Sequence, residues 1–281
     1  MTASIPDIQL NDGNHMPLAG LGLYKTAGSA QATQAVAAAI GAGCRLFDTA
    51  SAYKNESDVG AALSACGIPR DKLFITTKVW NNAQRIGDVS GAFERSLDRL
   101  GLDYVDLYLI HWPVPGCYAA TWKELERLKA SGRIRSIGVS NFEIVHLEQL
   151  SRISDIVPAV NQIEYHPLCA RTALLQYCRS HGIAVQAYAP LARGAYADRE
   201  VLKTIGAKYK KTAAQTGLRW LVQQGISVIP KSVNPDRIRC NLDLFDFTLT
   251  DAEMDTISAM DEQLHTSHVP EDLLGTDWNK P

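Results

Sequence analysis

The strongest constraint in this sequence is the regular alternation of two kinds of segment. Short apolar runs alternate with amphipathic stretches of ten or more residues, in which apolar side chains recur at i, i+3 and i+4. This alternation is typical of strand–helix units that build a parallel sheet. We expect eight strands, at residues 18–21, 46–48, 73–78, 104–111, 134–140, 159–164, 184–188 and 227–231.

The amphipathic stretches predict helices between these strands. We expect them at residues 31–42, 88–100, 122–131, 144–153, 172–181 and 213–224. Glycines at 101, 132, 182 and 225 stand where a left-handed residue commonly ends a helix. An N-terminal hairpin is expected around the Asn11-Asp12-Gly13-Asn14 turn. Because no linker or low-complexity tract interrupts the alternation, residues 1–281 are expected to form one domain.

Polar residues at the ends of the strands separate two architectures. An open sheet would gather its functional groups at one crevice, whereas a closed (β/α)8 TIM barrel collects them from every strand at one rim. Seven successive strands end in a polar residue: Asp48, Lys78, His111, Ser140, Gln162, Tyr188 and Lys231. This pattern favours the barrel.

Charge and cysteine content exclude several classes of function. The 28 Lys and Arg residues are balanced by 30 Asp and Glu residues, so no bulk field attracts nucleic acid or an acidic membrane. No apolar run approaches the ~18 residues that span a bilayer, and no export signal precedes the hairpin. The six cysteines have no disulfide or metal spacing. We expect a cytoplasmic monomer without a metal, acting on a small molecule.

Several common catalytic motifs are missing. The two GxG stretches, at 20–22 and 41–43, lack the third glycine of the Rossmann fingerprint, and no Walker A, HExxH or GxSxG sequence occurs. Any chemistry must therefore use other groups.

Asp48, Tyr53, Lys78 and His111 form the best candidate catalytic set. Taken singly, they are better explained as a helix cap, a half-buried aromatic, a solvated rim cation and a hydrogen-bonded core residue. Together they favour a shared site, because neighbouring parallel strands lie ~4.8 Å apart and their ends converge.

The chemistry of this set is carbonyl reduction. A phenol of pKa ~10 is a weak acid at neutral pH, and a neighbouring cation would lower its pKa by stabilising the tyrosinate. Lys78 would supply that cation and Asp48 would orient Lys78. His111 would hydrogen-bond the carbonyl oxygen, and Tyr53 would protonate it as a nicotinamide delivers hydride to the carbon.

The sequence resembles the aldo-keto reductase superfamily over nearly its whole length. The resemblance rests on DTASAYKNE at 48–56, on AFERSLDRL at 92–100 leading to YVDLYLIHWP at 104–113, and on IPKSV at 229–233, with GVSNF and NQIEYHP in order between them. It implies a barrel closed at its base by the hairpin, NADPH extended across the top, and Asp48, Tyr53, Lys78 and His111 as the catalytic tetrad.

The resemblance also implies the residues that bind NADP(H). Ser140, Asn141 and Gln162 would hold the nicotinamide carboxamide and Tyr188 would stack on its ring. The other implied contacts are Gly22, Leu191, Gly194, Lys231, Ser232, Val233, Asn234, Arg237 and Asn241. Of these, Lys231, Ser232, Asn234 and Arg237 would clamp the 2′-phosphate with donors alone. Cys240 stands where many relatives carry a Glu that accepts from the adenine.

Tyr24, Trp80, His111 and Trp112 are expected to line the substrate pocket. The loops at 113–120 and 191–200 are short, as in microbial and protozoan members that include 2,5-diketo-D-gluconate reductases and trypanosomatid prostaglandin F synthases. We therefore expect an open, shallow pocket for varied carbonyls, with prostaglandin, keto-sugar or reactive-aldehyde reduction as candidate roles. A non-catalytic NADP-binding barrel, as in channel subunits or crystallins, and an NAD(P)-linked alcohol oxidant remain alternatives.

Overall fold

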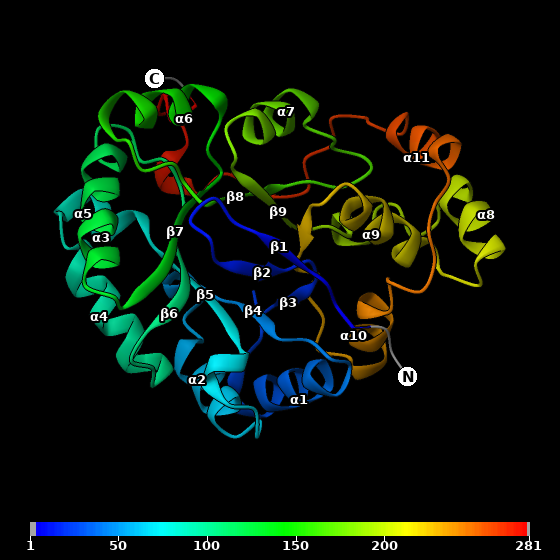
Figure 1. Cartoon of the computed structure of the whole chain (residues 1–281), viewed down its shortest axis with the longest axis horizontal. Coiled ribbons are helices and arrows are strands. Elements are labelled where there is room, and N and C mark those ends of the chain that lie inside the picture. Colours follow the sequence, from blue (N-terminus) through cyan, green and yellow to red (C-terminus); the bar gives the residue numbers. More distant parts are fainter. Residues whose placement is uncertain (1–3, 280–281) are drawn as a thin grey trace.

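A closed barrel of eight parallel strands forms the centre of the molecule (Figure 1). The computed structural model describes residues 4–279. The sheet runs in the order β10-β9-β8-β7-β6-β5-β4-β3, and bridges from Ala19 to Val228 and from Gly22 to Lys231 join its two edges. The strands are β3 (Gly20–Gly22), β4 (Leu46–Asp48), β5 (Phe74–Val79), β6 (Val105–Ile110), β7 (Ile134–Ser140), β8 (Val160–Glu164), β9 (Ala184–Tyr188) and β10 (Ser227–Val228). The predicted TIM barrel and its eight strands are confirmed.

Helices surround the barrel and bury their apolar faces against its outer surface (Figure 1). They are α1 (Gly28–Gly41), α2 (Glu56–Ser64), α3 (Asn81–Ile86), α4 (Val89–Leu100), α5 (Tyr118–Ala130), α6 (Ile144–Ile153), α7 (Thr172–Ser180), α8 (Glu200–Lys208), α9 (Ala213–Gln223), α10 (Pro235–Leu242) and α11 (Asp251–Ser258). The six expected helices are present with ends shifted by at most four residues. The four glycines expected after helices all have positive φ, between 64° and 82°. None of the described helices is long and apolar enough to cross a membrane.

The N-terminal hairpin covers one end of the barrel. Strands β1 (Asp7–Gln9) and β2 (His15–Pro17) pair antiparallel, with Ile8 opposite Met16. Met16 is fully buried and belongs to the same apolar cluster as Leu107 and Val160 from inside the barrel. The hairpin thus closes the base as expected, which leaves the carboxyl ends of the strands to form the site.

Candidate active site

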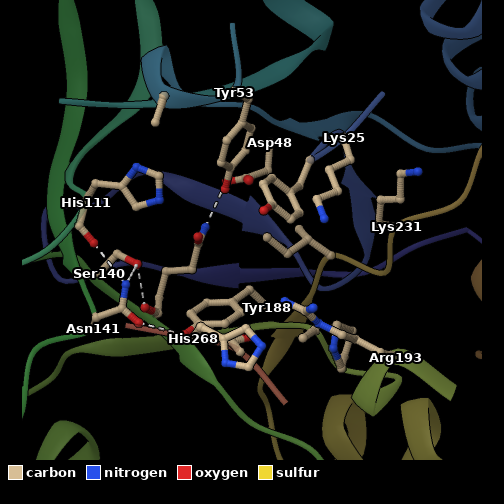
Figure 2. A pocket seen from close by; sticks show the side chains of 18 of the residues that line it. Lys25, Asp48, Tyr53, His111, Ser140, Asn141, Tyr188, Arg193, Lys231 and His268 are labelled. Carbon is tan, nitrogen blue, oxygen red and sulfur yellow. Dashed lines mark hydrogen bonds between the residues drawn. The ribbon is translucent and has the colours of Figure 1, made fainter. Parts of the chain in front are cut away.

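The carboxyl ends of the strands surround a cavity of about 1460 Å³ (Figure 2). Asp48 is the last residue of β4, Lys78 lies near the end of β5, and His111 follows β6 directly. All but one of the expected catalytic and substrate-pocket residues line this cavity: Asp48, Tyr53, His111, Tyr24, Trp80 and Trp112. The exception, Lys78, is completely buried beneath the cavity floor.

Lys78 connects the acid and the phenol of the candidate set. Its Nζ lies 2.6 Å from Oδ1 of Asp48, 2.9 Å from the carbonyl oxygen of Thr49 and 3.3 Å from the hydroxyl of Tyr53. The strand register explains this contact. Thr76 pairs with Asp48, and Lys78 lies two residues further on the same face of the sheet. Asp48, Tyr53 and Lys78 therefore lie close together, as the convergence of the strand ends predicted.

Tyr53 reaches Lys78 from a tight turn after β4. It ends the 3-10 helix η1 (Ser51–Tyr53), which the left-handed Lys54 terminates. The hydroxyl of Ser51 donates to the carbonyl of Lys78 at 2.9 Å. The buried Asn55 donates its amide to the carbonyl of Leu23 at 2.8 Å. The loop that carries Tyr53 is thus fastened on both sides.

The pKa of Tyr53 differs from the expectation. Burial raises it well above its ordinary value and the charge of Asp48 raises it further, whereas we expected the neighbouring cation to lower it. Burial has the opposite effect on Lys78, whose charged form it disfavours: it lowers the pKa of Lys78, although Asp48 opposes that shift. The physical reason is that the phenol is removed from water and lies near the carboxylate of Asp48, and both effects disfavour the tyrosinate in the resting site. Tyr53 is a neutral phenol at pH 7.

His111 is a neutral imidazole beside Tyr53. Burial lowers its pKa well below the ordinary value, and the charge of Lys78 lowers it further. Its ring meets the rings of Tyr53 and Trp80 edge-on, with centroids 5.6 and 4.9 Å away. Among the described residues, none hydrogen-bonds its Nδ1. A neutral imidazole can donate one hydrogen bond to an oxygen in the cavity.

Ser140, Asn141 and Tyr188 lie together on one wall of the cavity (Figure 2), which Gln162 also lines. Asn141 adopts a left-handed backbone conformation with φ of 62° and donates its amide to the carbonyl of His111 at 2.9 Å. The hydroxyl of Tyr188 donates to Oδ1 of Asn141 at 2.7 Å. Gln162 gives both amide hydrogens to side chains, so its carbonyl oxygen is the group left to accept a hydrogen bond.

Basic residues line the far end of the cavity. Lys231, Ser232, Arg237 and Asn241 line the cavity, as do Gly22, Leu191 and Gly194, and Figure 2 shows Lys231 on the side away from His111. Burial lowers the pKa of Lys231, and the charge of Lys25 adds to that effect.

Two of the expected cofactor-binding residues do not line the cavity. Val233 and Asn234 are not among the described residues that line the cavity. The side-chain oxygen of Asn234 caps helix α10 by accepting the backbone N–H of Arg237 at 3.0 Å. The first backbone N–H groups of a helix have no partner within the helix, and this oxygen satisfies one of them. The side-chain oxygen of Asn234 therefore fixes the start of α10, where Arg237 lies.

A model of the aldo/keto reductase family matches residues 19–262 of this sequence. The chain belongs to the aldo/keto reductase family. It is 46% identical over 275 residues to a glyoxal reductase from Bacillus subtilis, which covers 98% of this chain and 100% of that protein. It is 48% identical over 261 residues to a methylglyoxal reductase from Yersinia pestis, with 91% and 93% covered.

Solved structures of aldo/keto reductases share this fold. A protein from Brucella melitensis superposes with a TM-score of 0.88 at 43% identity, covering 92% of this chain and 100% of that one. A Bombyx mori aldo-keto reductase, solved in complex with NADP, gives a TM-score of 0.90 at 38% identity, with 97% and 98% covered.

The cavity has a further wall that was not predicted from the sequence. Residues 267–272 of the C-terminal segment line the cavity. Trp278 packs edge-on against Trp112, with centroids 5.3 Å apart. The segment lacks periodicity, so no local signal placed it there. Lys25 and Arg193 also line the cavity and were not anticipated.

Proposed function

We propose that this aldo/keto reductase reduces small aldehydes and ketones to alcohols with NADPH. The observation that carries the proposal is the contact of Lys78 with both Asp48 and Tyr53 beneath a cavity in which neutral His111 is ready to donate. Reactive dicarbonyls such as methylglyoxal are the proposed substrates, because two of its relatives are named glyoxal and methylglyoxal reductase.

The cavity suits a nicotinamide dinucleotide. At one end of the cavity, Ser140, Asn141 and Gln162 present buried hydroxyl and amide groups that would hold the nicotinamide carboxamide. Tyr188 would stack on the nicotinamide ring. Gly22 also lines the cavity, and a Cβ there would lie 2.7 Å from the carbonyl oxygen of Ile229, so glycine is needed where β3 packs against residues 229–231. Lys231 and Arg237 would bind the 2′-phosphate at the other end, and Asn241 the adenine.

When bound, NADPH supplies hydride to the carbonyl carbon. His111 donates a hydrogen bond to the carbonyl oxygen and holds it near Tyr53. As negative charge develops on that oxygen, Tyr53 transfers its phenolic proton to it, which completes the alcohol. Lys78 stabilises the tyrosinate left behind, and Asp48 keeps Lys78 charged and in place.

The direct test is NADPH consumption by the purified chain with methylglyoxal, 4-nitrobenzaldehyde, a keto-sugar and prostaglandin H2. We expect turnover with the two aldehydes at the greatest kcat/KM. Preference for the keto-sugar or the prostaglandin would replace the proposed substrate by one of the other two roles. NADPH binding without turnover of any carbonyl would indicate a binding module, and turnover only of alcohols with NAD(P) would indicate an oxidant.

We further propose that the protein acts as a cytoplasmic monomer of one domain. All six cysteines are free thiols in the structure, which suits a reducing compartment. Light scattering of the purified chain should give the mass of one copy, and a single cooperative unfolding transition should accompany it.

A further inference from the structure

The segment after helix α11 is tied to the barrel although it has little regular structure. The backbone N–H groups of Glu262 and Leu264 donate to the carbonyl of Leu168, at 3.2 and 2.9 Å. The carboxylate of Asp261 accepts the backbone N–H of Ala170 at 3.1 Å. The segment therefore runs alongside the loop that follows strand β8.

Glu164, the last residue of β8, makes the most concentrated of these contacts. Its Oε1 accepts the backbone N–H and the hydroxyl of Thr266 at 2.7 and 2.6 Å, and its Oε2 accepts the N–H of Ser267 at 3.3 Å. The imidazoles of His166 and His265 lie 3.3 and 3.4 Å from the carboxylate. Glu164 is 3% exposed, so these donors replace water.

The donors also keep Glu164 ionised. Burial acts to raise its pKa, but hydrogen bonds from His166 and Thr266 outweigh burial and lower the pKa to about 2. A buried carboxylate with this many donors is a strong anchor, because charge-assisted hydrogen bonds exceed neutral ones in strength.

A second anchor lies a few residues further along the chain. The carboxylate of Asp272 accepts from the amide of Asn81 at 3.2 Å and from the guanidinium of Arg85. Leu273 is fully buried in a cluster with Trp112. Residues 268–271 span the gap between the two anchors, and all four line the cavity.

We infer that Glu164 is a positioning residue that holds residues 268–271, and above all His268, as a preformed wall of the substrate pocket. Figure 2 shows His268 on the same side of the cavity as Tyr188. The inference rests on the proposed function, since it assigns this wall to selection among carbonyl substrates. Glu164 itself is not among the described residues that line the cavity, and it holds the segment from the end of β8.

A preformed wall matters most for a large substrate. A bulky carbonyl substrate would pack against the segment. If the segment is already ordered before the substrate binds, none of the binding free energy is spent on ordering the segment. We expect a substrate as small as methylglyoxal to reach Tyr53 and His111 without that contact. Release of the anchor should therefore raise KM for bulky substrates and leave small ones nearly unchanged.

The first measurement is hydrogen exchange in the full-length protein without substrate. In Glu164→Gln, one oxygen becomes a donor that faces the N–H of Ser267, so we expect exchange at Thr266 and Ser267 to accelerate at least tenfold. Asp106→Asn is the matched control. Asp106 is also 3% exposed and accepts a backbone N–H, that of Ile75, at 2.9 Å, but it lies at the opposite end of the barrel. Unchanged exchange in Glu164→Gln would overturn the inference.

The second measurement is steady-state reduction of 4-nitrobenzaldehyde and methylglyoxal. We expect Glu164→Gln to raise KM for the aromatic aldehyde at least fivefold, with kcat for both substrates and KM for methylglyoxal within twofold. His268→Ala should raise the same KM in the unmodified protein and add little in the Glu164→Gln background. Equal rises for both carbonyls, the same rise in Asp106→Asn, or fully additive effects of the two changes would show general loosening and overturn the inference.

The two measurements separate this inference from the proposed function. Faster exchange in a protein whose unmodified form reduces no carbonyl would reject the proposed function, and with it the role in substrate selection, while retaining the anchor. Turnover with normal selectivity in Glu164→Gln would retain the function and reject the positioning role.

Discussion

Gln162 donates its side-chain amide to Oδ2 of Asp48 at 2.7 Å, although 114 residues separate them in the chain. The other carboxylate oxygen accepts Lys78. Asp48 thus connects Gln162, which is proposed to bind nicotinamide, to Lys78, which is proposed to support proton transfer from Tyr53. The second amide hydrogen of Gln162 goes to Gln186 at 2.6 Å.

Replacement of Gln162 should therefore affect binding and chemistry together. In Gln162→Leu we expect NADPH affinity to fall about tenfold, the value of one hydrogen bond of ~1.4 kcal/mol, and kcat to fall as well because Asp48 loses a donor. Gln186→Leu removes the other partner of Gln162 and leaves Asp48 untouched. Fluorescence titration and steady-state kinetics of both variants measure this, and a loss of affinity with unchanged kcat would contradict the link.

Tyr53→Phe should abolish carbonyl reduction while NADPH binds within a few-fold of the unmodified protein. The hydroxyl is the proposed proton donor, and the raised pKa of Tyr53 keeps it protonated at neutral pH. Tyr104→Phe is the control, since its hydroxyl contacts Arg135 away from the cavity. Retention of more than a tenth of kcat in Tyr53→Phe would assign proton donation to another group.

Lys78→Met should lower both activity and stability. Removal of one member of a buried ion pair leaves Asp48 uncompensated, which costs about 3–5 kcal/mol of unfolding free energy. The double variant Asp48→Asn/Lys78→Met should recover part of this stability but none of the activity. Denaturant unfolding monitored by Trp fluorescence gives both values, and equal stabilities of the single and double variants would argue against the charge-pair explanation.

The lowered pKa of His111 predicts a pH dependence of stability. Below the ordinary pKa of 6.5, the unfolded chain binds a proton at His111 that the folded protein excludes. The contribution of His111 to stability is therefore fully present above pH 6.5 and declines as pH falls below it. The difference in unfolding free energy between the unmodified protein and His111→Gln should change between pH 7 and pH 5, and a constant difference would refute the assignment.

Carbonyl reduction should respond to His111 in a substrate-dependent way. His111→Ala is expected to reduce kcat/KM by different factors for an aldehyde and a bulky ketone, because the imidazole places the carbonyl oxygen. An identical proportional loss for the two substrates would count against positioning.

The basic end of the cavity should make NADPH preferred over NADH. Two charge-assisted contacts of ~1.5–3 kcal/mol each correspond to a factor of about 10² to 10⁴. Arg237→Ala should weaken NADPH much more than NADH, and added salt should narrow the difference. Arg239→Ala is the control, since Arg239 pairs with Asp236 and does not line the cavity. Equal dissociation constants in the unmodified protein would mean that these cations form only a solvated rim.

The sequence by itself determined the barrel and brought the tetrad residues together. Strand and helix periodicity is a local property, so the runs at 46–48, 134–140 and 184–188 predicted strands with the observed bounds. The cap on α10 was missed: Asn234 precedes Pro235 at the first helical position, but it was expected to bind the 2′-phosphate. Helices α2 and α8 were not assigned, although α7, which has the same length of nine residues, was.

Only the tertiary structure decided the electrostatics of the site and its substrate wall. Whether Tyr53 has a raised or lowered pKa depends on its burial and on its distance from the charge of Asp48, and neither is a property of local sequence. The wall depends on Glu164 meeting Thr266, a contact between residues 102 positions apart. Hydrogen bonds of this kind have no sequence period, because they form only once the closed barrel brings the C-terminal segment to the end of β8.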